Sequence, residues 1–114
     1  MIVLYILLLL CALYILALQG RRNHPLWSCF RAQRFAHRGY HDKPQIPENS
    51  LPAFRRAIAH GWGAELDVHL LKDGTLAVFH DSSLSRCTGA QGMIEDLTLA
   101  ELRALRLEGT DEHV

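Results

Sequence analysis

The chain has 114 residues, with twelve basic and twelve acidic side chains and a formal net charge of zero. This balance excludes the broad positive surface of a nucleic-acid-binding protein, so no nucleic-acid partner is expected. Cys11, Cys29 and Cys87 are odd in number and have no C-x-x-C spacing, which predicts neither a disulfide framework nor a zinc site.

The first 18 residues form an unbroken apolar run that ends immediately before Gln19-Gly20-Arg21-Arg22. As a helix the run would be about 27 Å long, close to the hydrocarbon thickness of a bilayer. A cleaved signal peptide is the alternative, but the basic start and A-x-A-like site are missing. We therefore predict a transmembrane helix over residues 1–19 of a single-pass membrane protein. Because the basic residues follow the run, the globular part is expected in the cytoplasm.

Residues 20–33 are predicted to form a juxtamembrane linker that holds Pro25, Trp27 and Phe30. Tryptophan near a membrane end is typical of the interfacial belt. Alternatively, these aromatic side chains pack on the outer helices of the domain that follows, because amphipathic side chains serve either role. Both interpretations stay open.

From residue 34 onward the pattern predicts strands and helices. Arg34-Phe35-Ala36-His37 indicates a first strand that ends at His37. A loop rich in Pro, Asp and Lys follows over residues 41–49. Ser50 is placed to cap a helix whose apolar residues at 51, 54 and 58 recur on one face.

Three further elements are predicted downstream. Residues 64–70 alternate between apolar and polar side chains, which indicates a strand with two distinct faces. Residues 76–80 are nearly all apolar and indicate a strand buried on both faces. Residues 98–105 indicate a helix that opens with a capping box. The opening pattern is therefore that of an α/β protein.

Two carboxylates occupy the polar face of the predicted strand 64–70. Glu65 and Asp67 are two residues apart, so both point the same way with Cα atoms about 7 Å apart. They repel each other unless a proton or a cation intervenes, and Ca²⁺ or Mg²⁺ suits oxygen ligands. On spacing alone, the alternative to a metal site is that the two carboxylates lie on a solvated strand face or form ion pairs at the surface.

His37 and His80 each end a predicted strand. Imidazole titrates near neutral pH and suits general acid-base work, although a histidine at a strand end commonly satisfies local hydrogen bonds instead. His69 shares the face of the two carboxylates and is a weaker candidate. Asp81 is expected to cap the next segment, and orienting His80 is the alternative.

Arg38 is the candidate for binding phosphate. Its planar guanidinium offers two parallel hydrogen bonds to phosphate oxygens. An equally open interpretation is that Arg38 pairs with Glu48 or Asp81 as part of the scaffold, because buried arginines are normally paired.

Five motifs in this order resemble the N-terminal part of the glycerophosphodiester phosphodiesterase family. They are His-Arg-Gly at 37–39, Pro-Glu-Asn-Ser at 47–50, Glu-Leu-Asp-Val-His at 65–69, Asp-Gly at 73–74 and His-Asp at 80–81. The resemblance covers residues 35–114. It implies a (β/α)8 TIM-type barrel and metal-dependent hydrolysis of a small glycerophosphodiester to sn-glycerol 3-phosphate and an alcohol.

The resemblance also implies roles for individual residues. Glu65 and Asp67 would bind Ca²⁺ or Mg²⁺, together with a third carboxylate that lies beyond Val114. His37 would act as the base and His80 as the acid, with the roles exchangeable. Arg38 would bind the substrate phosphate.

Glu48 is expected to have a supporting or metal-side role, because the Pro-Glu-Asn segment of the family lies beside the His-Arg-Gly loop.

A TIM barrel typically needs about 250 residues. We therefore predict that residues 34–114 are a partial barrel domain, truncated at its C-terminus and inactive alone, and that hydrolysis belongs to the full-length protein. The alternative is a noncatalytic membrane protein that acts by pairing with another subunit, because incomplete sheet edges favour association.

Overall fold

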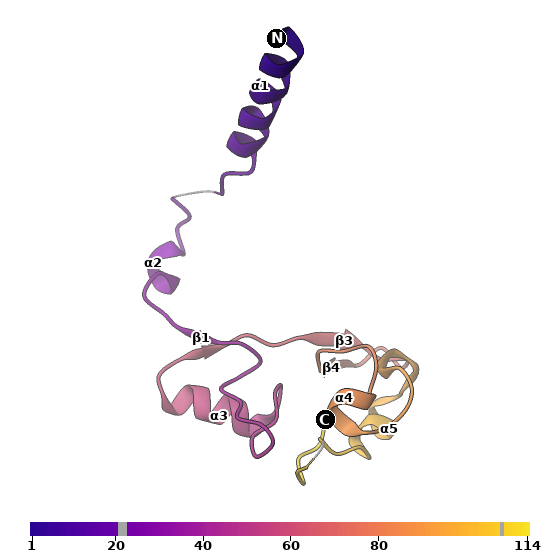
Figure 1. Cartoon of the computed structure of the whole chain (residues 1–114). Coiled ribbons are helices and arrows are strands. Elements are labelled where there is room, and N and C mark those ends of the chain that lie inside the picture. Colours follow the sequence, from indigo (N-terminus) through magenta and orange to yellow (C-terminus); the bar gives the residue numbers. More distant parts are fainter. Residues whose placement is uncertain (21–22, 108) are drawn as a thin grey trace. The chain divides into compact units, whose positions relative to one another are not determined.

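The computed structural model describes residues 1–20, 23–107 and 109–114, and the chain forms two compact units, Met1–Ala32 and Gln33–Val114. Residues 21 and 22 of the predicted linker lie outside the described residues. Figure 1 shows the helices and strands of each unit.

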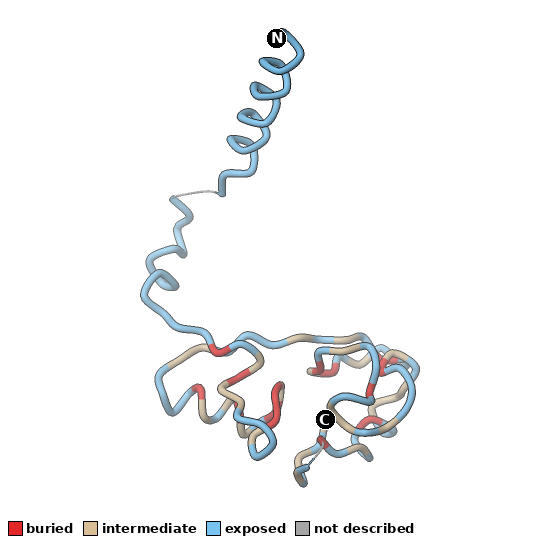
Figure 2. Tube along the Cα trace, viewed as in Figure 1, coloured by how far each residue is buried: buried red, intermediate tan, exposed pale blue. Residues whose placement is uncertain are grey.

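The first unit consists of two helices and has no buried described residue. α1 runs over Ile2–Ala17 and α2 over Trp27–Phe30. Every described residue up to Ala32 is exposed, as Figure 2 shows. Because α1 carries no charged residue, it has an apolar surface all round and no polar face.

Within the described part of the chain, no helix has both the length and the apolar character needed to cross a membrane. α1 has 16 residues. At 1.5 Å per residue its length is about 24 Å, against about 30 Å for the hydrocarbon core. The transmembrane helix predicted over residues 1–19 is therefore not supported, because the helix ends at Ala17.

The second unit begins with a strand, a helix and a parallel strand. β1 (Phe35–Ala36) pairs with β2 (Gly63–Ala64), and α3 (Leu51–Ala59) connects them. Ser50 caps α3 as predicted, because its Oγ accepts a hydrogen bond from the Ala53 N–H at 3.3 Å. The buried face of α3 therefore holds β1 and β2 in place.

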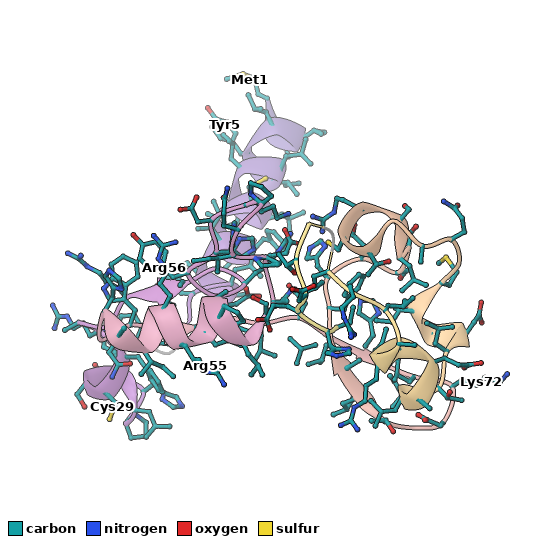
Figure 3. The ribbon with its side chains drawn as sticks, turned by 90° about the horizontal axis from the view of Figure 1, so that it is seen from below. Met1, Tyr5, Cys29, Arg55, Arg56 and Lys72 are labelled. Carbon is teal, nitrogen blue, oxygen red and sulfur yellow. The ribbon has the colours of Figure 1, made fainter. Side chains whose placement is uncertain are left out.

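The loop between β1 and α3 contacts the side chain of Arg56 on α3. The Arg56 guanidinium lies 4.3 Å from the Tyr40 ring centroid and 3.4 Å from Asp42 Oδ2. In Figure 3, Arg55 projects from the opposite side of the helix. The contacts of Arg56 therefore tie residues 40–42 to α3, and Arg55 offers a natural control position.

The second half of the unit starts with an antiparallel hairpin. β3 (Val68–Leu70) pairs with β4 (Leu76–Val78), with His69 opposite Ala77. The connecting turn contains Gly74 with φ +82°, and it is too short for a parallel crossover. These two strands therefore run in opposite directions.

The strand predicted over 64–70 divides into two. Its first part ends at Ala64, its last part begins at Val68, and residues 65–67 between them belong to neither strand. The Glu65 N–H donates to the Ala36 carbonyl at 3.0 Å, whereas the Asp67 carbonyl accepts from Phe79 at 3.0 Å. The segment thus changes partner from β1 to β4 at the two carboxylates.

The core of this unit lies behind the hairpin. Three short elements cover it: α4 (Ser85–Thr88), the 3₁₀ helix η1 (Ile94–Asp96) and α5 (Leu99–Arg103). The predicted capping box of α5 is present, formed by Thr98 and Glu101. The buried side chains of this cluster are Leu71, Ala77, Phe79, Leu84, Ile94, Leu102 and Leu107.

Candidate active site

The tight turn after β1 sets the position of the first candidate residues. Arg38 has φ +57° and Gly39 φ +81°, both in the left-handed region. A Cβ added to Gly39 would lie 2.8 Å from the Ala53 Cβ, so the turn packs directly against α3. The turn leaves the His37 side chain 70% exposed and Arg38 largely covered, at 18%.

Arg38 lies among three carboxylates. Its backbone N–H donates to Glu65 Oε2 at 3.1 Å, and Nη1 donates to Glu48 Oε1 at 3.0 Å. Its Nε lies 3.5 Å from Asp67 Oδ2. The interpretation that Arg38 pairs with Glu48 is therefore confirmed, and its guanidinium also lies beside Asp67, whereas phosphate binding by Arg38 stays a prediction.

Glu48 is a buried anion that contacts three cations. It accepts from Arg38, and from Arg86 Nη2 and Nη1 at 2.6 and 3.0 Å, and it forms an ion pair with Lys43. Despite burial, the hydrogen bonds from Arg86 and then Lys43 hold its pKa well below the usual range. Glu48 is therefore charged and holds these basic side chains together.

Asp81 contacts both His80 and Arg86. Its Oδ1 accepts from His80 Nδ1 at 2.5 Å, and Arg86 Nε donates to Oδ2 at 2.6 Å. The hydrogen bonds from Arg86 and then His80 lower the Asp81 pKa. The expectation that Asp81 caps the next helix is wrong, because α4 begins after Leu84 and has no side-chain cap. Asp81 instead orients His80.

The ring nitrogens of His69 bond to groups other than the two carboxylates whose face it was predicted to share. Its Nδ1 donates to Glu95 Oε1 at 2.7 Å and its Nε2 to the His80 carbonyl at 2.9 Å. Burial opposes the charged imidazolium, but the bonds to His80 and Glu95 raise the His69 pKa overall. Both ring nitrogens are occupied, so His69 supports the end of β4 and has no ring nitrogen left for a substrate.

The comparison with protein families identifies the group to which these residues belong. The model of the glycerophosphoryl diester phosphodiesterase family matches residues 37–113, from the first candidate histidine almost to the end of the chain. The chain belongs to this family.

Curated relatives and solved structures agree with this assignment. The chain is 48% identical over 71 residues to the glycerophosphodiester phosphodiesterase of Caldanaerobacter subterraneus subsp. tengcongensis, covering 61% of this chain and 28% of the relative. It is 42% identical over 77 residues to glycerophosphodiester phosphodiesterase 1 of Bos taurus, covering 66% and 22%. The chain thus spans about a quarter of the length of the curated relatives it matches.

Structural neighbours belong to the same family. A glycerophosphoryl diester phosphodiesterase from Parabacteroides distasonis superposes with a TM-score of 0.65 at 33% identity, covering 71% of this chain and 30% of that one. A phosphodiesterase from Oleispira antarctica, solved with the product sn-glycerol-3-phosphate, gives 0.57 at 44% identity, covering 64% and 29%. These neighbours support the predicted TIM-barrel type of fold for the domain.

The two carboxylates predicted to bind a metal in this family each keep one oxygen available. Glu65 Oε2 accepts from the Arg38 N–H, and Asp67 Oδ2 accepts from Asn49 Nδ2 at 3.1 Å. Within residues 1–20, 23–107 and 109–114, no hydrogen bond is made to Glu65 Oε1 or Asp67 Oδ1. Buried Asn49 Oδ1 also lacks a partner there. These oxygen atoms suit a hard divalent cation.

The described residues supply only part of a metal site. Among them, no group of three or more His, Cys, Asp or Glu side chains could hold a metal ion. Glu65 and Asp67 fit as two ligands, and the third carboxylate beyond Val114 stays a prediction.

Lys43 and Arg86, which contact Glu48, were not predicted from the sequence as residues of the site. Arg86 reaches Glu48 across 38 positions of sequence, and neither residue belongs to a motif that indicates the contact.

Proposed function

We propose that this protein hydrolyses glycerophosphodiesters to sn-glycerol 3-phosphate and an alcohol. The observation that carries the proposal is the position of Arg38, a largely covered guanidinium braced by Glu48 and placed beside Glu65 and Asp67. The family match over residues 37–113 supports phosphodiester hydrolysis as the reaction. The structure of the Oleispira antarctica relative with sn-glycerol-3-phosphate supports the choice of product.

Arg38 is the proposed phosphate-binding residue. Nη1 is engaged by Glu48, and Nε is buried with no hydrogen-bond partner among the described residues. Within those residues Nη2 donates no hydrogen bond either. Nη2 is therefore the nitrogen of the guanidinium that can donate to a phosphate oxygen and stabilise charge that develops in the transition state, whereas Nε faces Asp67.

His37 and His80 are the proposed proton-transfer groups. The exposed His37 ring lies with its Nε2 4.0 Å from Glu65 Oε2. Asp81 holds His80 by Nδ1, which leaves Nε2 for exchange with substrate. One imidazole would accept the proton of the attacking oxygen and the other would protonate the departing alkoxide, with the two roles exchangeable.

Glu65 and Asp67 are the proposed ligands of a divalent cation, Ca²⁺ or Mg²⁺. When bound, such an ion withdraws charge from a non-bridging phosphate oxygen. Asn49 and Arg38 would orient the Asp67 carboxylate through Oδ2, and the Arg38 N–H would orient Glu65 through Oε2. Fixed carboxylates of this kind hold a metal in one geometry.

The proposed hydrolysis requires a complete barrel, including the segments of the relatives that lie outside the region matched by this chain. A rival function, pairing with another subunit without catalysis, is favoured by one observation. Leu66, the β3 residues Val68 and Leu70, and Leu76 of β4 are each 46–66% exposed. The placement of the chain at a membrane, with its globular part in the cytoplasm, stays a prediction that a topology reporter would test.

The test is a hybrid enzyme. Residues 33–114, the second compact unit, replace the matching segment of the Caldanaerobacter relative, and release of sn-glycerol 3-phosphate from glycerophosphocholine is measured. The hybrid should hydrolyse glycerophosphocholine, and a chelator should abolish this activity. His37→Ala should lower the rate by at least a hundredfold, in the range of general acid-base catalysis.

His41→Ala is the matched control, a second histidine of the same loop for which the structure gives no ion pair or hydrogen bond to the site. It should leave the rate within twofold of the parent hybrid. A folded hybrid without hydrolysis, while the parent relative turns over, contradicts the proposed function. Hydrolysis by His37→Ala at the parental rate contradicts the role of His37.

A further inference from the structure

Arg86 bridges two carboxylates that serve different candidate residues. Its guanidinium donates twice to Glu48, at 2.6 and 3.0 Å. It donates twice to Asp81, from Nε at 2.6 Å and from Nη2 at 2.9 Å. The result is a continuous chain of hydrogen bonds from His80 through Asp81, Arg86 and Glu48 to Arg38.

This geometry restricts the state of the His80 ring. Both Asp81 oxygens accept hydrogen bonds from Arg86, so the carboxylate stays anionic and its plane is fixed. An anionic carboxylate only accepts, so the His80 nitrogen that faces it, Nδ1, must carry a proton. Neutral His80 is then confined to one tautomer, with Nε2 unprotonated.

Only a guanidinium provides this bridge. Lysine carries the same charge at one nitrogen, without the planar fork that reaches two carboxylates with two bonds each. The substitution Arg86→Lys therefore keeps the charge and removes the geometry, which separates the two contributions.

We propose that Arg86 is a positioning residue: by holding Asp81 it fixes His80 with Nδ1 protonated, and through Glu48 it ties His80 to the phosphate-binding Arg38. The inference rests on the proposed function for its catalytic meaning. It assigns to Arg86 and Asp81 the task of presenting His80 Nε2 as the nitrogen that exchanges a proton with substrate.

The other charged groups around His80 come from β3 and η1. The His69 ring donates to the His80 carbonyl, and Glu95 pairs with His69. These contacts hold the backbone of His80 and leave the ring to Asp81. If Arg86 had a purely structural role, its removal would lower stability without changing the His80 tautomer.

The test is the tautomer of His80 in the full chain, labelled with ¹⁵N-histidine and measured by long-range ¹H–¹⁵N correlation at a pH where the ring is neutral. The wild type should show protonated Nδ1 and unprotonated Nε2. Arg86→Lys should give a mixture of both tautomers. Asp81→Asn should shift the population to protonated Nε2, because an amide nitrogen donates where the carboxylate accepted.

Arg55→Lys is the matched control, since Arg55 is an exposed arginine of α3. It should leave the His80 nitrogen shifts unchanged. Far-UV circular dichroism checks folding, and Asp81→Asn serves if Arg86→Lys does not fold. Folded variants at both positions with the wild-type tautomer overturn the proposal.

Activity separates this inference from the proposed function. In the hybrid enzyme, Arg86→Lys should lower kcat at least tenfold and change its pH profile, because the wrong tautomer presents the wrong nitrogen. A tautomer shift in the chain combined with no hydrolysis by the parental hybrid sinks the proposed function and leaves the positioning of His80 intact. An unchanged kcat and pH profile in Arg86→Lys overturns the positioning role.

Discussion

Replacing Glu48 by Gln removes the anion at the centre of the charged cluster. The Glu48 side chain is 6% exposed, whereas its partners Arg38 and Arg86 are 18% and 41% exposed. Removing one partner of a buried ion pair costs about 3–5 kcal/mol, because the other charge stays buried and unpaired. Arg86 keeps water and Asp81 as partners, so we expect the lower end, about 3 kcal/mol.

Thermal unfolding of the full chain, followed by circular dichroism, measures this loss. For a unit of this size, about 1 kcal/mol corresponds to roughly 4–8 °C, so Glu48→Gln should lower Tm by roughly 12–24 °C. Asp42→Asn is the matched control, because Asp42 pairs with Arg56 at the surface and is 67% exposed. Such a pair contributes about 0–1 kcal/mol.

The pH dependence gives a second check on Glu48. Its folded pKa is lowered, so its contribution to stability is present above the ordinary carboxylate pKa and is lost as pH falls toward the folded value. Stability of the wild type should therefore decline in acid more steeply than that of Glu48→Gln. If Glu48→Gln and Asp42→Asn lose equal, small amounts of stability, the reasoning that Glu48 holds the cluster together is wrong.

Three further predictions follow from the packing, the turn and the histidine network. Phe79 lies in the core and is 2% exposed, so Phe79→Ala should lower the free energy of unfolding, measured with urea, by about 3–5 kcal/mol. A loss below about 1 kcal/mol would contradict the assignment of Phe79 to the core. Gly39→Ala should destabilise by about 1–3 kcal/mol by the same method, because of its left-handed φ and the contact with Ala53, whereas Gly20→Ala, with open space around it, should have little effect. The pKa of His69 is raised in the folded chain. The stability that His69 contributes to the fold is therefore fully present below the ordinary histidine pKa and is lost as pH rises through the folded pKa. In the variant His69→Gln, the free energy of unfolding should decline less between pH 6 and 9 than in the wild type. An unchanged decline would refute the stabilising role of protonated His69.

Local sequence signals predicted the local structure well. The cap of α3 at Ser50 and the capping box of Thr98 and Glu101 each depend on residues three positions apart, so the chain itself places the partners together. The alternative that Arg38 pairs with Glu48 was also available from sequence, because their motifs flank one loop. The roles proposed for His37, His80, Glu65 and Asp67 stay predictions.

Contacts between distant segments could not be predicted in the same way. Arg86 reaches Glu48 across 38 positions of sequence, from α4 to the loop that precedes α3, and no periodic pattern encodes that contact. The alternation over residues 64–70 predicted one strand, since side-chain alternation does not reveal that the backbone changes partner at Glu65. Hydropathy alone also overestimated the N-terminal helix, which ends at Ala17.

The central claim is that residues 33–114 carry the phosphate-binding, proton-transfer and metal-binding side chains of a phosphodiesterase site. Release of sn-glycerol 3-phosphate by the hybrid enzyme, compared between the parental hybrid and Glu65→Ala at saturating Ca²⁺ or Mg²⁺, tests it most directly. The account predicts metal-dependent release by the hybrid and none by Glu65→Ala. Equal release by both, with or without added metal, would contradict it.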